Sequence, residues 1–381
     1  MPRSLPVELL TLIAGLVSQP TLANLALTSK TAYAVSIGPL YTAIPSMNAL
    51  RTVQSLGTLA MSTFLALLVR SCNIDAPIED DESGYLSELV TTALKNMTGL
   101  TELSLRLSPS FSSVVLQKAR FRLRKLECVI VSAPEYPVAR FLNYQHALES
   151  LYLDCAGTER RFSSILSPKA LPILKDISAP PQLLLKILPR RLCHTTSISS
   201  LGTIIDPNIL GELIMLFHRA PTSPTTPVEC ILGLDFSAPT WRQEIVARAL
   251  SLLGQAAPWI GSLRLEVHSG RVEQDFLSRH LAQILSNYLS LHTLAITFPP
   301  QCRIRAYMYP DPLCNINLHV LHLNEWRGAC PTLKLIVFPK VQYKYTQLPV
   351  DEEEGALCTE GWLEALGFPN PQAPFSVYFK N

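Results

Sequence analysis

A short apolar string recurs along most of the chain, with apolar side chains at its first, fourth and sixth positions. Side chains alternate between the two faces of a strand, so the fourth and sixth positions predict a short strand that is buried on one face. The clearest copies are Leu100/Leu103/Leu105, Leu123/Leu126/Cys128, Leu148/Leu151/Leu153, Ile231/Leu234/Phe236, Ile260/Leu263/Leu265, Leu291/Leu294/Ile296 and Leu318/Leu321/Leu323. Weaker copies are Val69/Cys72/Ile74, Leu171/Leu174/Ile177 and Ile198/Leu201.

The intervals between several of these strings carry a helical pattern. Residues 86–97, 241–253 and 275–288 have apolar side chains at the spacing of one helix face. A strand with its returning helix cannot bury its apolar face alone, so such units stack with parallel strands on one side and helices on the other. We therefore predict an α/β protein whose repeats form an irregular solenoid. The alternative is a doubly wound α/β domain, which would favour glycine-rich turns after the strands, and these are absent.

Three short helices are predicted in residues 4–44. Pro6 suits the first turn of the first helix, which is expected to end at residues 18–20. Helices this short cannot bury all their apolar side chains among themselves. The surplus side chains form a candidate interface made of Leu5, Pro6, Leu9, Leu10 and Ile13.

The second and third helices follow directly. Thr21 is the expected cap of the second helix, and either Thr28 or Ser29 caps the third. The third helix is expected to run to Ile37 and to stop at residues 38–39, where glycine is followed by proline.

The order and spacing of three strings in this region resemble the F-box family. They are L-P-V-E-L-L-x-x-I at residues 5–13, L-x-x-L-x-L-T-S-K at residues 22–30 and P-L-Y at residues 39–41. The resemblance implies that residues 1–45 dock on the Skp-type linker protein of a cullin ubiquitin ligase. Tyr33 stands where many members of the family have tryptophan. By motif position, the contact with the linker would be made by Leu5, Pro6, Leu9, Leu10, Ile13, Leu22 and Leu25. A helical cap on the following domain is the alternative interpretation.

Residues 46–340 resemble a leucine-rich-repeat array. The spacing of 23 to 33 residues between successive strings only loosely fits that family, and the usual asparagine is mostly missing. Residues 326–338 are similar to the closing segment of F-box repeat proteins, with a helix leading through Pro331 into a last strand. Residues 341–381 are expected to form a C-terminal loop, acidic at residues 351–354, and a cap with a short helix near residues 362–366.

The face of the strands that points away from the helices is the candidate surface for a protein target. Residues next to the fourth and sixth positions of each string point to that face because side chains alternate. Their mixed charge with one aromatic ring suits a polar protein surface better than a nucleic-acid groove. The candidate residues are Arg106, Lys125, Glu127, Tyr152, Asp154, Arg264, Glu266, His322 and Asn324.

Composition favours a folded protein without a nucleic-acid or membrane surface. Of its 381 residues, 48% are hydrophobic and 16% are charged, and the formal net charge is only +2. Its nine cysteines form no C-x-x-C pair, which indicates reduced thiols in the cytoplasm, the nucleus or both. Residues 1–17 are interrupted by Pro6 and Glu8 and do not resemble a signal peptide, and residues 52–69 are expected to form a buried helix.

No sequence motif of an enzyme or a metal site is recognised. A nucleophile elbow, a phosphate-binding loop and a zinc-protease motif are all missing, so we expect no catalytic residue and no cofactor. His319 and His322 would point to opposite faces of a strand, so no metal site is expected there. The leading hypothesis is a non-catalytic substrate adaptor of a ubiquitin ligase. The alternatives are a repeat scaffold without a ubiquitin role and an enzyme with an acid–base pair in a deep pocket.

Overall fold

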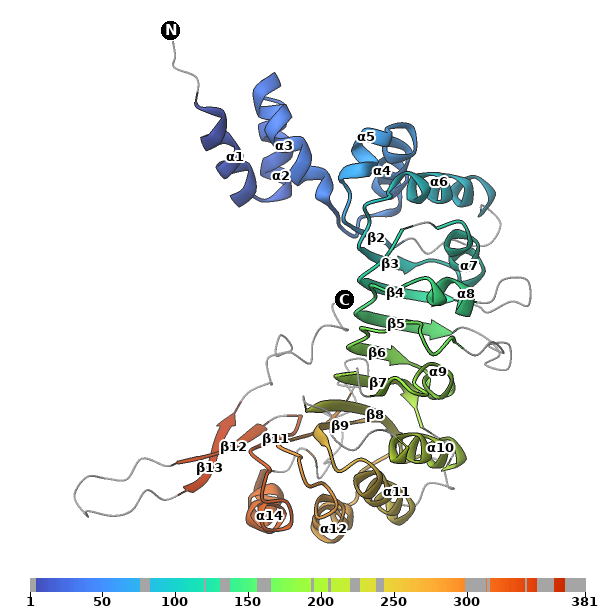
Figure 1. Ribbon diagram of the computed structural model, residues 1–381. Coiled ribbons are helices and arrows are strands. Elements are labelled where there is room, and N and C mark those ends of the chain that lie inside the picture. The colour runs from blue at the N-terminus through green and yellow to red at the C-terminus, as the bar shows by residue number, and fades with distance from the viewer. Residues whose placement is uncertain are drawn as a thin grey trace, which may run out of the picture. The chain divides into compact units, whose positions relative to one another are not determined.

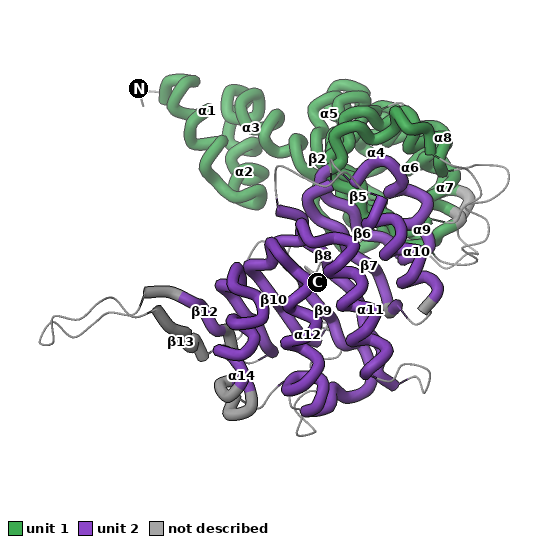
Figure 2. Tube along the Cα trace, turned by 60° about the horizontal axis from the view of Figure 1, so that its bottom comes forward, with its two compact units in different colours: residues 1–174 green, residues 175–381 purple. Residues whose placement is uncertain are grey.

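The computed structural model has an α/β fold, as predicted from the sequence (Figure 1). The structure describes residues 5–75, 83–119, 121–130, 138–155, 166–192, 195–204, 207–219, 227–237, 243–298, 313, 316–339, 341–347 and 360–366. The chain divides into two compact units, residues 1–174 and residues 175–381 (Figure 2). The predicted domain boundaries at residues 45 and 340 fall inside these units. The predicted acidic loop at residues 351–354 lies outside the described residues.

Three helices begin the first unit, as the sequence predicts. They are α1 (Val7–Leu16), α2 (Gln19–Ala26) and α3 (Lys30–Thr42). Ser29 caps α3, since its hydroxyl oxygen accepts a hydrogen bond from the Ala32 amide at 3.1 Å.

Two of the predicted boundaries of these helices are wrong. The second helix starts at Gln19 with Ser18 as its N-cap, because Pro20 is tolerated in a first helical turn. The third helix continues through Pro39 to Thr42, because proline removes only one backbone donor from the helix.

The rest of the first unit alternates strands and helices. Its strands β1 (Ala43–Ile44), β2 (Ser71–Asp75), β3 (Glu102–Arg106), β4 (Lys125–Ile130) and β5 (Ser150–Cys155) are all parallel to their neighbours. Its further helices are α4 (Ala49–Met61), α5 (Thr63–Leu68), α6 (Ser83–Asn96), α7 (Pro109–Gln117) and α8 (Val138–Asn143). The single helix predicted at residues 52–69 is two helices, because Ser62 leaves the helical conformation and caps α5.

The fourth and sixth positions of the repeated string form the core of this unit. Cys72, Leu103, Leu126 and Leu151 lie in register across β2 to β5, and all four are buried. The next inward row is Ile74, Leu105, Cys128 and Leu153, and it is also buried. The predicted inward face of these strands is therefore confirmed. Burial of each such side chain stabilises the fold by about 1.5–3 kcal/mol.

The second unit continues the same alternation. Its strands are β6 (Asp176–Ala179), β7 (Ser197–Thr203), β8 (Val228–Asp235), β9 (Ile260–Ser269), β10 (Thr293–Thr297) and β11 (Leu335–Val337), each parallel to the next. Its helices are α9 (Pro181–Ile187), α10 (Pro207–His218), α11 (Gln243–Ala256), the π-helical turn η4 (Phe276–His280), α12 (Leu281–Leu285) and α14 (Ile316–Ala329). The strands β12 (Val341–Gln347) and β13 (Glu360–Leu366) extend the sheet in antiparallel fashion.

Two predicted elements of this unit are wrong. Residues 318–323, predicted as a strand, belong to α14, because a spacing of three residues between leucines fits one helix face as well as a strand. Residues 362–366, predicted as a helix, lie in β13, where pairing with β12 overrides their local preference.

The helix and strand predicted on either side of Pro331 are confirmed, but the strand is not the last one, because β12 and β13 follow it. α14 leads through Pro331 into β11, and the Trp326 side chain is fully buried behind it. The indole N–H of Trp326 donates to the Leu277 carbonyl at 3.2 Å. His319 stacks on Phe338 at 3.8 Å between ring centroids. Within the described residues, none of the helices is long and apolar enough to cross a membrane.

Candidate interaction surfaces

Helix α1 has two apolar faces, and within the described residues one of them is much more buried than the other. Leu10, Ala14 and Val17 follow a helical spacing, and they are half-buried or buried where α1 meets α3. Leu9, Leu12, Ile13 and Leu16 form a second stripe with the same kind of spacing, and all four are exposed. The exposed fraction reaches 63% for Leu12 and 86% for Leu16. An exposed stripe of four large aliphatic side chains marks a surface suited to a partner.

The residues predicted for linker binding are distributed unevenly between surface and core. Leu5, Pro6, Leu9 and Ile13 are exposed, whereas Leu10 and Leu25 are half-buried. Leu22 is only 2% exposed, so its side chain belongs to the core of the helical module and not to its surface. Leu12 and Leu16 were not among the predicted linker contacts, although both lie on the exposed stripe.

The strand face of the first unit carries the predicted polar residues side by side. The Arg106 guanidinium lies 3.1 Å from a carboxylate oxygen of Glu127, and both side chains retain contact with solvent. Glu127 is in register with Tyr152, whose pKa is raised by burial and by the nearby Asp154 and Glu127. Lys125 is half-buried on the same face. The structure therefore brings these five predicted residues onto one surface with both signs of charge.

The equivalent face of the second unit is more deeply buried. Arg264 Nε lies 3.1 Å from Glu266 Oε1, and His268 Nε2 lies 3.9 Å from Glu266 Oε2. Glu266 is only 5% exposed. The arrangement is thus a buried charge network on β9, where the sequence predicted an open polar face.

A second carboxyl group, from Glu229 on β8, belongs to the same face. It lies in register with Ser262, and among the described residues neither its Oε1 nor the Ser262 hydroxyl has a hydrogen-bond partner. Burial raises the pKa of Glu229 to about 7, Arg264 opposes this rise and Asp176 adds to it. The sequence reasoning did not single out Glu229, because nothing local signals that its carboxyl group loses water.

His322 and Asn324 do not belong to the strand face. Both lie on α14, where His322 is half-buried and Asn324 is exposed. His322 Nδ1 lies 3.2 Å from a carboxylate oxygen of Glu325, one helical turn away. Their predicted place on a strand is wrong, because residues 316–329 form a helix.

The described part of the chain contains no group of three or more histidine, cysteine, aspartate or glutamate side chains placed to hold a metal ion. Comparison with protein-family models and with curated protein sequences finds no match to this chain. The assignment of function therefore rests on the surfaces themselves.

Proposed function

We propose that this chain is a non-catalytic substrate-recognition adaptor of a Skp–cullin–F-box ubiquitin ligase in the cytoplasm, the nucleus or both. The exposed apolar stripe on α1 carries the proposal. Leu9, Leu12, Ile13 and Leu16 are 39% to 86% exposed. Burying the remaining surface of each side chain against a partner would contribute up to about 1.5–3 kcal/mol. The Skp-type linker protein is the partner that the F-box resemblance of residues 5–41 implies.

The repeated strands and helices that follow α3 would supply the target-binding part of the adaptor. Their parallel strands with buried alternate positions support an irregular leucine-rich-repeat-like solenoid, which would present its polar strand face to an unknown protein target. Arg106 and Glu127 are the most accessible charged pair on that face. Holding a target near the ligase would raise the effective concentration of its lysines, with no catalytic residue and no cofactor required of this chain.

The proposal is tested by co-purification of the linker protein and the cullin with the full chain. The double variant Leu9→Asp/Ile13→Asp places two charges in the exposed stripe and should abolish their recovery. Thr11→Asp is the matched control, because Thr11 is exposed on the same helix outside the stripe. Unchanged recovery with the double variant, with α-helical circular dichroism intact, would overturn the proposal.

A repeat scaffold with an N-terminal cap is the second candidate, and one observation favours it. β1 pairs with β2, and the Arg70 amide donates to the Thr42 carbonyl at 2.8 Å, so the end of the helical module is joined to the first repeat. If the module is only a cap, deleting residues 1–42 should expose the end of the array and make the remainder aggregate. A soluble remainder that has lost linker binding would exclude the cap.

A further inference from the structure

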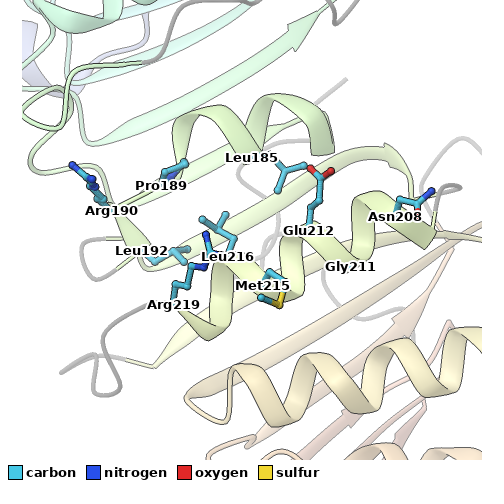
Figure 3. Close-up of a pocket in the computed structure, with 10 residues that line it drawn as sticks. All are labelled: Leu185, Pro189, Arg190, Leu192, Asn208, Gly211, Glu212, Met215, Leu216 and Arg219. Carbon is cyan, nitrogen blue, oxygen red and sulfur yellow. The ribbon is translucent and has the colours of Figure 1, made fainter.

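An open groove lies on the helical side of the second unit, away from the strand face (Figure 3). Its volume is about 1200 Å³, and its walls come from α9, the turn that follows α9, and α10. α9 has seven residues and α10 has twelve. The lining residues along α10 run from Asn208 to Arg219, just after its end, so the groove follows the whole length of this helix.

The floor of the groove is apolar and adaptable. Leu185, Leu192, Met215 and Leu216 line it. Met215 is 51% exposed, whereas Leu192, which also lines the groove, is buried. Methionine is flexible and polarizable, which suits a surface that adjusts to an incoming apolar side chain.

The charges along the groove are asymmetric. Arg190 and Arg219 lie toward the end of the groove where α10 finishes, whereas Asn208 and Glu212 lie toward its start (Figure 3). In the described part of the chain, neither arginine has an ion pair or a side-chain hydrogen bond. Two guanidinium groups beside an apolar floor are complementary to a ligand with carboxylates next to aliphatic side chains.

The backbone at Arg190 adds a second observation. Its φ angle is 67°, in the left-handed region that non-glycine residues rarely adopt. Arg191, the next residue, is buried, and its guanidinium donates to the Ile187 and Pro189 carbonyls. The buried Arg191 therefore holds the turn in place, and this turn carries Arg190 outward at the groove. Backbone strain of this kind is often found at binding sites.

From these features we infer that the groove binds a short acidic segment of a partner protein, with aliphatic side chains on the Leu185–Met215 floor and Asp or Glu carboxylates at Arg190 and Arg219. A twelve-residue helix is roughly 18 Å long, so the groove accommodates roughly six residues of an extended segment. This interaction is separate from linker docking by α1 and does not depend on the proposed ligase role.

The test is selection of peptides from a displayed random library against the full chain, with binding of the enriched peptides measured by fluorescence anisotropy. The expected peptides combine aliphatic residues with Asp or Glu, and the variant Arg190→Glu/Arg219→Glu should weaken them by about tenfold or more. Met215→Asp should weaken them as well, because it places a charge on the apolar floor.

Two control variants make the result specific. Arg248→Glu reverses an exposed charge on α11, outside the groove, and should leave peptide binding unchanged. Leu9→Asp/Ile13→Asp should also leave it unchanged, which separates failure of this inference from failure of the proposed function. Peptides that lack acidic residues, peptides that bind the charge-reversed variant equally well, or no enrichment at all would overturn the inference.

Discussion

Replacing Glu229 with glutamine probes the charge network on the strand face of residues 175–381. The carboxyl group lies beside the Ser262 hydroxyl, and burial is the main reason that its pKa rises from 4.5 to about 7. The nearby Arg264 lowers this pKa and Asp176 raises it. Both effects are smaller than that of burial, so lost solvation of the carboxylate determines the direction of the pKa shift.

The magnitude follows from the difference in pKa between the folded and unfolded states. Below pH 4.5 the group is protonated in both states, and the fold has its full stability with respect to this group. As the pH rises toward 7, the unfolded chain releases the proton first, and stability falls. Each pKa unit is worth about 1.4 kcal/mol, so a rise from 4.5 to about 7 corresponds to a loss of at most about 3.5 kcal/mol. Because the carboxyl group keeps some contact with water, we expect about 2 kcal/mol.

The assay is urea denaturation between pH 5 and pH 8, monitored by tryptophan fluorescence. All four tryptophans of the chain, Trp241, Trp259, Trp326 and Trp362, belong to residues 175–381, so the signal reports on this unit. Near pH 5 the unfolding free energy of Glu229→Gln should differ from that of the wild type only by the cost of the substitution itself. Toward pH 8 the unfolding free energy of the variant should rise by about 2 kcal/mol relative to that of the wild type.

The control is Glu244→Gln, which changes an exposed carboxyl group on α11 of the same unit. It should leave the pH dependence of the wild type unchanged. A difference in unfolding free energy between Glu229→Gln and the wild type that stays constant from pH 5 to pH 8, or that falls, would refute the reasoning.

Two further predictions concern stability alone. Leu126→Ala should destabilise the first unit by about 2–5 kcal/mol. Arg106→Ala removes a solvent-exposed ion pair and should destabilise this unit by less than about 1 kcal/mol. Thermal unfolding followed by circular dichroism measures both effects, and equal effects would contradict the burial of Leu126 and the exposure of Arg106. Gly270→Ala should destabilise the second unit by more than about 1 kcal/mol, because its φ is 78° and an added Cβ would come within 2.4 Å of the Phe236 backbone. Gly211→Ala on α10 meets no atom within 4 Å and should instead stabilise this unit by about 0.5–1 kcal/mol.

The failures of sequence prediction have identifiable physical causes. The pattern at residues 318–323 satisfies both a strand and a helix, and only the packing of Trp326 and His319 against neighbouring elements decides for α14. β13 is likewise set by pairing with β12, which no local pattern encodes. The helix through Pro39 continues because one lost hydrogen bond does not outweigh the remaining contacts of α3.

The candidate surfaces also include features that the sequence predicts and features that it does not. The apolar surplus of residues 5–13 could be recognised from its spacing, but the sequence could not distinguish the packed Leu22 from the exposed Leu16. The charge network of Arg264, Glu266 and His268 was expected as a solvated face, and its burial depends on what packs near it in three dimensions. The groove beside α10 had no local signal, since its lining comes from α9, the turn after α9, and α10 together.

The sequence by itself determined the α/β class, the strand positions that are buried in the first unit and the three helices at the start of the chain. These features depend on side chains two to four residues apart, which the alternation of strands and the turn of helices bring together. Tertiary structure alone decided which side of α1 is left exposed, which carboxyl groups lose water and which side chains of α9 and α10 line the groove. Such properties depend on residues that are far apart in the chain and meet only when the chain folds.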